Sequence, residues 1–294
     1  MRVAIITDGA ASLPDERAEI DNITVVPLRV ALGMAVKEDA PPTLAEVLSV
    51  HPSKVHTSFP APARYLAAIN RCHSDAGVVI CTVAASLSGS HHAAVWAAKR
   101  AQVPVRVVDT RTASGGQGLV VLAAARVAET GASLDVVADS AIRYSARVRL
   151  VGTVDSFDRL VASGRVSHLA GWAANRLGVH PVFELRDGRI RELRPAHSQR
   201  AAEMRMIECF RASGRPGSAL HVSVLHVLAP ERARRILELV ASEQAPVIAY
   251  TSEFDAAMAT HLGPGVVGLA WWRELRGLCK CATNAEEDRC RRFL

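Results

Sequence analysis

A short apolar run, Gly77-Val-Val-Ile-Cys-Thr82, is followed by the hydroxyl-rich turn Ser86-Leu-Ser-Gly-Ser90 and by an Ala-rich stretch over 91–101. This order predicts a buried strand, a turn and a helix. The free N–H groups and the positive dipole end of a helix start favour a bound anion. We expect Ser88 to cap this helix and Gly89 to let a ligand approach the backbone closely.

A second turn of the same kind, Thr57-Ser-Phe-Pro-Ala-Pro62, precedes a helix predicted over 64–72. Ligands of α/β sheets bind beyond the carboxyl ends of the strands, so two hydroxyl-bearing helix starts can converge there on one ligand. The alternative is that both turns are ordinary N-caps. Either turn considered alone is more typical of an ordinary N-cap than of a ligand site.

Strands and helices alternate on both sides of these turns. Strands are predicted over 3–8, 77–82 and 103–109, and helices over 116–130 and 133–147. This alternation is typical of a parallel sheet with helices on both faces. Residues 23–32 are expected as one extended edge segment, because Pro27 has no N–H. The glycines in 114–118 lack the dinucleotide-binding register and predict a tight strand-to-helix turn instead.

The pattern changes after a short strand predicted over 150–154. Two short helices are expected over 155–177, and Asp187-Gly188 is a strong hairpin turn signal between strands at 180–185 and 190–193. Helices and strands then alternate to residue 271, so the second half is predicted to hold a mixed sheet. We divide the chain into an N-terminal α/β domain (1–152), a C-terminal mixed α/β domain (153–276) and a flexible tail (277–294).

The composition is typical of a well-buried globular protein. Of the 294 residues, 49% are apolar and 22% are charged. We expect no stable membrane insertion, because no apolar run approaches the roughly 18 residues of a membrane span. The first apolar run is too short for a signal peptide, so we expect a cytoplasmic protein. The net charge of +6 comes mostly from scattered Arg, and the aromatic content is 4%. Nucleic-acid binding is therefore not expected.

The six cysteines do not form a recognisable motif. Cys72, Cys81 and Cys209 fall in strand or helix patterns and are expected to be buried apolar residues. The other three lie in the polar tail, at 279, 281 and 290, with a spacing that matches no zinc site. We expect neither a metal nor a cofactor.

Six short segments, spread over most of the chain, are informative because of the order in which they occur. They are Ile6-Thr-Asp-Gly-Ala-Ala-Ser-Leu-Pro14, Thr57-Ser-Phe-Pro-Ala-Pro62, Ser86-Leu-Ser-Gly-Ser90, Leu160-Val-Ala-Ser-Gly-Arg-Val-Ser167, His180-Pro-Val-Phe-Glu-Leu-Arg-Asp-Gly188 and His261-Leu-Gly-Pro-Gly265. In this order they resemble the DegV family of bacterial fatty-acid-binding proteins, over about residues 3–272. The resemblance implies two α/β domains with a ligand tunnel between them. It also implies a carrier, not an enzyme, that presents a long-chain fatty acid to a separate ATP-dependent kinase.

The resemblance also implies the site residues. Thr57 and Ser88 are expected to bind the fatty-acid carboxylate, with Ser58, Gly89 and His261 close to it. Arg165 corresponds to a basic residue of the family and is expected to face the ligand mouth or the kinase. We expect a monomer.

Three positions depart from the family pattern. Gly9-Ala10 stands where the family has Ser-Thr, Phe59 replaces a Gln, and Ser163-Gly164 replaces a Gly-Gly pair. The change to Phe59 bears on the geometry of the head group.

Two other functions remain open. A serine hydrolase would use Ser88 with His261 and an acid such as Asp109 or Asp255, although Ser88 lacks the Gly-x-Ser-x-Gly elbow. A regulatory protein that senses a small acid would use the same polar clamp with a shorter cavity. Outside the family context, a His at a helix end before Gly is more typical of a C-terminal cap than of a ligand contact.

Overall fold

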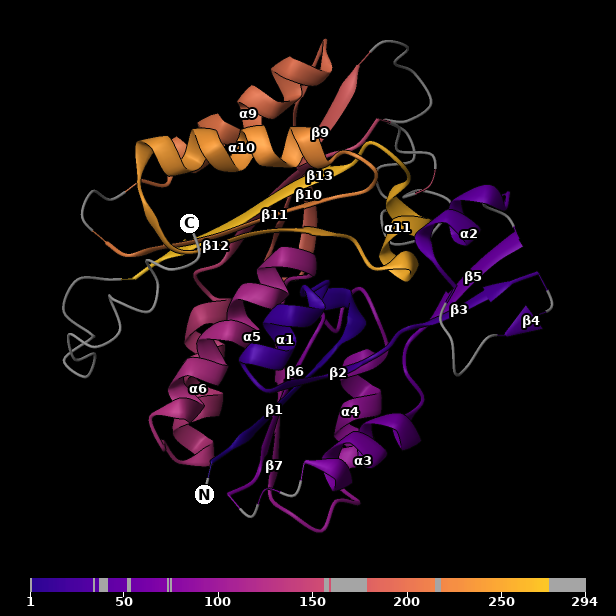
Figure 1. The fold of residues 1–294 in the computed structure, drawn as a ribbon, viewed down its shortest axis with the longest axis vertical. Helices are drawn as coiled ribbons and strands as arrows, with labels where there is room; N and C mark the ends of the chain where they lie inside the picture. The colour runs from indigo at the N-terminus through magenta and orange to yellow at the C-terminus, as the bar shows by residue number, and fades with distance from the viewer. Residues whose placement is uncertain are drawn as a thin grey trace.

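Helix α5 (Ser114–Glu129) lies between two β-sheets and packs against both (Figure 1). The computed structural model describes residues 2–33, 35–36, 42–51, 54–72, 74, 76–155, 159, 179–214 and 218–274. Thirteen of the sixteen residues of α5 are buried. Small residues let it approach the second sheet, since a Cβ on Gly115 would lie 2.3 Å from Ser223 Oγ, and one on Gly118 2.4 Å from the Tyr250 hydroxyl. Helix α5 therefore joins the two halves of the protein.

The first sheet is parallel, as predicted, with strand order β2-β1-β6-β7. Its strands are β1 (Ala4–Asp8), β2 (Ile23–Val26), β6 (Val78–Thr82) and β7 (Val105–Asp109). Helices α3 (Pro62–Arg71) and α4 (Ser90–Ala98) cover one face through a cluster that contains Ile6, Tyr65 and Ile80. Helices α5 and α6 (Leu134–Ser145) cover the other face. The short elements η1 (Gly9–Ala11) and α1 (Asp15–Ile20) follow β1.

The second sheet is mixed, as predicted, with strand order β10-β9-β8-β13-β11-β12. Its strands are β8 (Arg149–Thr153), β9 (His180–Arg186), β10 (Arg189–Ala196), β11 (Leu220–His226), β12 (Pro246–Glu253) and β13 (Val267–Arg273). Helices α9 (Gln199–Ala212) and α10 (Pro230–Glu243) pack on its outer face. The predicted hairpin is confirmed, because Asp187 and Gly188 both have positive φ, 53° and 74°.

Three predictions about individual elements need correction. The division at 152/153 falls inside β8, which pairs with β9 and β13 and so belongs to the second sheet. Residues 23–32 are not one segment: the chain leaves the first sheet at Val26, and Pro27 precedes a different sheet. Cys81 is buried as expected, whereas Cys72 and Cys209 are only partly buried. Apart from Asp155 and Arg159, the helices expected over 155–177 lie outside the described residues, as do Arg165 and the tail cysteines.

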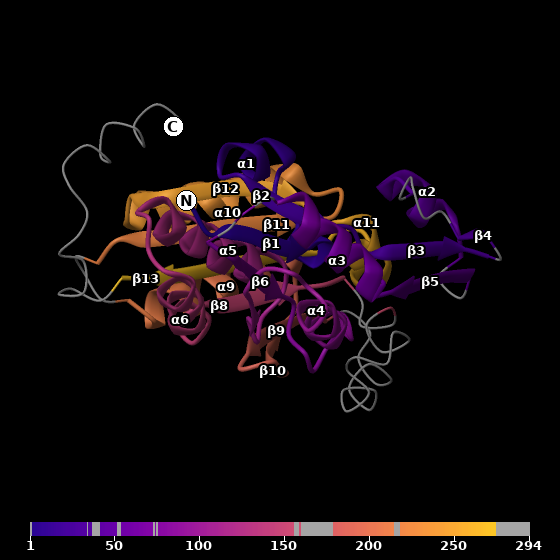
Figure 2. The same cartoon turned by 90° about the horizontal axis from the view of Figure 1, so that it is seen from below.

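A small third sheet was not expected. It pairs β3 (Arg29–Leu32) with β4 (Ala35–Val36) and β5 (Val55–Ser58), and it carries α2 (Leu44–Ser49). Figures 1 and 2 both show this unit at one side of the molecule, next to α11 (Ala256–Leu262). Val30, Val47 and Val55 pack against Ala257 of α11. The small sheet therefore joins a segment of the first half to a helix of the second.

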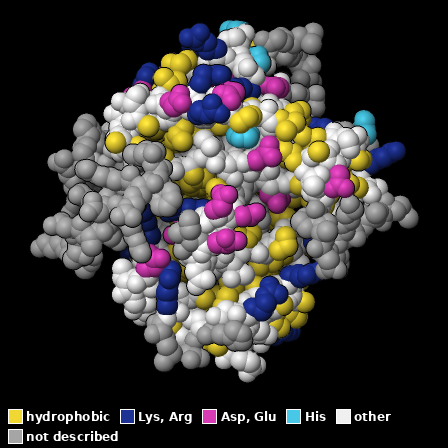
Figure 3. Space-filling model, in the orientation of Figure 1, with side chains coloured by type: hydrophobic (Ala, Val, Ile, Leu, Met, Phe, Trp, Pro, Cys, Tyr) yellow, Lys and Arg dark blue, Asp and Glu magenta, His cyan; other side chains and the backbone are white. Residues whose placement is uncertain are grey.

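The surface shows a mixed charge pattern. On the face drawn in Figure 3, the Lys and Arg of the described residues are spread among acidic side chains. No helix among the described residues is long and apolar enough to cross a bilayer. The same residues hold no group of three or more His, Cys, Asp or Glu arranged to bind a metal ion.

Candidate functional site

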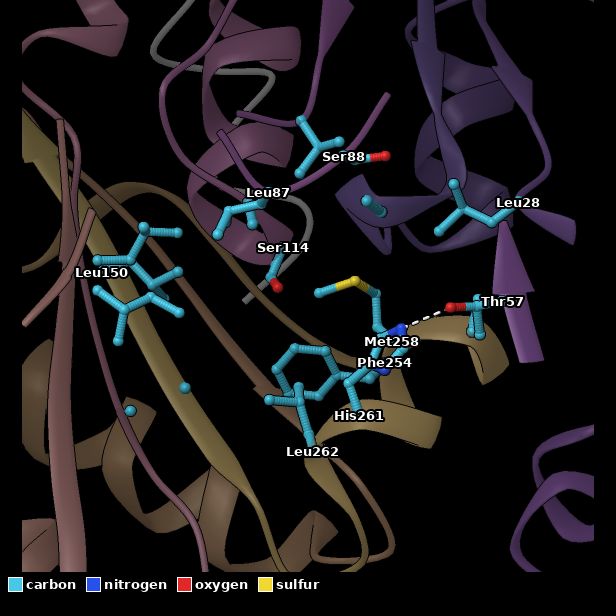
Figure 4. A pocket seen from close by; sticks show the side chains of 18 of the residues that line it. Leu28, Thr57, Leu87, Ser88, Ser114, Leu150, Phe254, Met258, His261 and Leu262 are labelled. Carbon is cyan, nitrogen blue, oxygen red and sulfur yellow. Dashed lines mark hydrogen bonds between the residues drawn. The ribbon is translucent and has the colours of Figure 1, made fainter. Parts of the chain in front are cut away.

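A cavity lies where the two halves of the protein meet (Figure 4). Its empty space measures about 970 Å³, part of it open to solvent. Most of the lining side chains are apolar and come from both halves: Ala10, Leu28, Phe59, Val83, Leu87 and Ala113 from the first, and Leu150, Phe183, Leu185, Ile190, Phe254, Ala257, Met258, Leu262 and Val266 from the second. Such a lining suits a ligand with a long apolar part.

The polar groups of the cavity include a pair from distant parts of the chain. Oγ1 of Thr57 lies 2.6 Å from Nε2 of His261. Thr57 is on β5 of the small sheet, and His261 is in the last turn of α11. The turn prediction for Thr57 and Ser58 was therefore wrong, since both residues lie on a strand. Their predicted place at a ligand site is compatible with the structure, because Thr57, Ser58 and His261 all line the cavity.

Ser88 lines the same cavity from the turn before α4. It is not the N-cap of this helix, which is Gly89. The Ser88 hydroxyl oxygen instead accepts a hydrogen bond from the Ser90 backbone N–H at 3.2 Å, and it lies 3.0 Å from Ser90 Oγ. The turn is thus held by its own hydroxyls, and Ser88 lines the cavity from it.

Phe59 changes the role expected for Gly89. A Cβ on Gly89 would lie 2.5 Å from Cε1 of the Phe59 ring, so the ring packs directly on this glycine. Gly89 itself does not line the cavity, whereas Phe59 does, with 45% of its surface exposed. The missing Cβ of Gly89 leaves space that the Phe59 ring occupies. The aromatic ring therefore covers the backbone that was expected to meet a ligand.

Ser114 is a cavity residue that the sequence analysis missed. It starts α5 with a φ of +52°, is 3% exposed and lines the cavity. In Figure 4 its hydroxyl points into the same space as Leu87 and Met258. The available signal was its position between the strand at 103–109 and two glycines, the same hydroxyl-at-helix-start pattern as at 86–90.

A buried carboxyl group holds the cavity wall of the first half. Asp8, at the end of β1, accepts hydrogen bonds from the backbone N–H of Val83 at 3.1 Å and of Ala10 at 3.2 Å. Gln117 of α5 donates to the same carboxyl at 3.0 Å, and the Tyr65 hydroxyl at 3.4 Å. Burial raises the pKa of Asp8 to about 6, against the lowering effect of these donors. Since Val83 and Ala10 line the cavity, Asp8 positions two of its walls.

The groups named for a hydrolase are engaged in other contacts. One oxygen of Asp109 accepts the backbone N–H groups of Ala85 and Arg111, and Asp255 caps α11 through the N–H of Ala257 at 2.8 Å. The Ser88 hydroxyl is bonded within its own turn. These contacts do not favour a Ser-His-Asp arrangement.

Comparison with known proteins identifies the family. The model of the family described as "Uncharacterised protein, DegV family" matches residues 2–274. A DegV domain-containing protein of Streptomyces coelicolor is 35% identical over 91% of this chain and 97% of its own length. The chain belongs to the DegV family.

Several similar proteins are named for fatty acid binding. A protein of Thermotoga maritima named "Fatty acid-binding protein" is 28% identical over 91% of this chain and 96% of its own. A solved structure titled "Fatty Acid Binding of a DegV family Protein from Thermus thermophilus" superposes with a TM-score of 0.84 at 26% identity, covering 93% of this chain and all of the other. Another solved structure comes from T. maritima, and its title reports a fatty acid binding function. It superposes with a TM-score of 0.82 at 25% identity, covering 93% of this chain and all of the other.

Proposed function

We propose that this protein binds a long-chain fatty acid, with its carboxylate among Thr57, Ser88 and His261 and its acyl chain in the cavity between the halves. The observation that carries the proposal is the composition of the cavity. Apolar side chains from both sheets form its walls, and the hydroxyls and the imidazole come from β5, the Ser88 turn and α11. Fatty acid binding by two relatives of the same fold supports it.

The polar groups suit a carboxylate without a buried counter-charge. Neither Lys nor Arg is among the described residues that line the cavity. A carboxylate only accepts hydrogen bonds, so the Thr57 and Ser88 hydroxyls would donate to it, and the imidazole N–H of His261 would donate either to it or to Thr57 Oγ1. Hydrogen bonds to a charged acceptor contribute roughly 1.5–3 kcal/mol each. Ser58 and Ser114 add hydroxyls at the same cavity.

The acyl chain supplies the larger part of the affinity. Each buried methylene contributes about 0.8 kcal/mol, so a long chain contributes on the order of 10 kcal/mol before the cost of ordering it. A short acid would gain the hydrogen bonds but little of this burial. The lining therefore favours a long-chain acid over a small acidic metabolite.

A separate kinase completes the proposal. We infer that the chain is a carrier that presents the bound acid to an ATP-dependent kinase, with Arg165 facing the ligand mouth or that partner. The contacts of Ser88, Asp109 and Asp255 support a carrier over a hydrolase.

Mass spectrometry of an organic extract of the purified protein tests the proposal. We expect a long-chain fatty acid, and rebinding of palmitic acid after delipidation. Release of a small acid alone would favour the sensor alternative. Labelling of Ser88 by a fluorophosphonate, with turnover of a chromogenic ester, would favour the hydrolase. ATP consumption by the isolated chain would contradict the carrier assignment.

A further inference from the structure

Two glycines stand opposite each other in the floor of the cavity. Gly152 of β8 pairs with Gly268 of β13, and both line the cavity. Their outer neighbours in the same row are Phe183 of β9, which pairs with Gly152, and Leu225 of β11, which pairs with Gly268. Glycine weakens a strand interior, so its presence commonly marks a place where another group approaches the backbone closely.

Side chains approach this row too closely for an added Cβ except at Gly268. At one end, a Cβ on Gly152 would lie 2.7 Å from Cζ of Phe183, so the Phe183 ring covers that glycine. At the other end, α5 packs on Leu225, whose Cδ1 lies 2.7 Å from the position of a Gly115 Cβ. A Cβ on Gly268 meets nothing closer than Phe254 Cζ at 3.5 Å and Leu150 Cδ1 at 3.7 Å. Among the two glycines of this row, Gly268 is therefore the one where a Cβ fits at ordinary contact distance, beside Phe254 and Leu150.

A Cβ on Gly268 would contact Leu150, which lies on the side of the cavity away from Thr57 and His261. Residues two apart on a strand share a face, so Gly152 lies on the same face as Leu150. In Figure 4, Leu150 is on the opposite side of the cavity from Thr57 and His261. An acyl chain whose carboxylate reaches Thr57 would extend toward Leu150 and the bare backbone at Gly268.

We infer that Gly268 sets the length of acyl chain that the cavity accepts. The inference rests on the proposed function and adds the feature that separates long from short acids. A side chain at 268 would occupy the space of the distal methylenes and leave the polar end untouched. Each methylene forced out of the cavity lowers affinity about fourfold.

Gly268→Leu and Gly268→Ala test this inference. Dissociation constants of both variants and the unaltered protein are measured for octanoic, lauric, palmitic and stearic acid. We expect Gly268→Leu to lose at least about tenfold in affinity for stearic acid and little for lauric acid. Gly268→Ala is expected to shift the preference in the same direction by less, and it fits at ordinary contact distances if the Leu variant does not fold.

Val267→Ala is the matched control. Val267 is the neighbouring residue of β13, and it packs on the opposite face of the sheet in the cluster with α9 and α10. This variant loses stability without touching the cavity, so we expect an unchanged chain-length profile. If Gly268→Leu folds and its chain-length profile is unchanged, the inference is wrong while the proposed function stands. If Gly268→Leu does not fold, an unchanged profile in Gly268→Ala has the same consequence. If the unaltered protein binds none of the four acids, the proposed function fails and the inference with it.

Discussion

Thr57 Oγ1 lies 2.6 Å from Nε2 of His261, although 204 positions separate the two residues in the chain. The contact depends on the packing of the small sheet on α11, where Val30, Val47 and Val55 meet Ala257. It brings a hydroxyl of the first half and an imidazole of the second to one point of the cavity. A bound carboxylate would therefore contact both halves at once.

Thr57→Val is expected to weaken palmitic acid binding by roughly tenfold to a hundredfold, because it removes one hydrogen bond to a charged acceptor and keeps the side-chain shape. Fluorescent-ligand displacement measures the change. Thr251→Val, at an exposed position on β12, is the matched control. Equal affinities of the Thr57 and Thr251 variants would remove Thr57 from the head-group site.

His261→Ala is expected to weaken binding by a similar factor and to leave the fold intact, as circular dichroism would check. Thr57 and His261 are in contact, so the double variant should lose less than the sum of the two single losses in binding free energy. Strict additivity in this cycle would show that the two side chains act on the ligand independently.

Ser88→Ala is expected to lower fatty acid affinity about tenfold, because a donor to the carboxylate is lost. The Ser90 N–H also loses its acceptor, so a small loss of thermal stability should accompany it. Ser242→Ala, exposed on α10, is the control. Wild-type affinity in a folded Ser88→Ala protein would contradict the assignment of Ser88.

Ser86→Ala should speed ligand release. The Ser86 hydroxyl donates to the carbonyl oxygen of Gly188 at 2.5 Å, and the Gly188 N–H donates to Arg111 O at 2.6 Å. These bonds hold the tip of the β9–β10 hairpin, whose Leu185 and Ile190 line the cavity. We expect the dissociation rate in stopped flow to rise several-fold. Ser74→Ala, which removes a comparable bond to Arg2 O far from the cavity, should leave the rate unchanged.

Asp8 makes the stability of the protein depend on pH. Its pKa is raised from 3.8 to about 6, so the folded state favours the protonated carboxyl. The contribution of this group is fully present below pH 3.8 and is lost as the pH rises through about 6, for a total of about 3 kcal/mol. Urea titration measures the free energy of unfolding of Asp8→Asn and of the unaltered protein. Between pH 3.8 and about 6, the unaltered protein should lose about 3 kcal/mol relative to Asp8→Asn.

The control for Asp8 is Asp139→Asn, an exposed position on α6. This variant controls for the loss of one exposed carboxyl, and its free energy of unfolding is measured at the same pH values. A difference between Asp8→Asn and the unaltered protein that does not change between pH 4 and pH 7 would mean that Asp8 titrates at its ordinary value.

Much of the fold could be predicted from local patterns. The buried strand over 77–82, the parallel first sheet and the Asp187-Gly188 hairpin all follow from periodicity and turn chemistry, which act over a few neighbouring residues. The small sheet could not, because β4 is two residues long and β5 is paired only through distant contacts. The same limit applies to Thr57, whose neighbouring prolines gave a turn signal while its backbone pairs with Val30.

By itself, the sequence determined most of the order of strands and helices, the parallel and the mixed sheet, and the hydroxyl-bearing turn over 86–90, since alternation and turn preferences are local properties. Tertiary packing alone decided that Thr57 meets His261, that the Phe59 ring covers Gly89, and that Ser114 opens into the same cavity. It also decided that Gly152 and Gly268 face each other across two strands. These relations depend on how apolar faces from distant parts of the chain are buried together, which no short window of sequence contains.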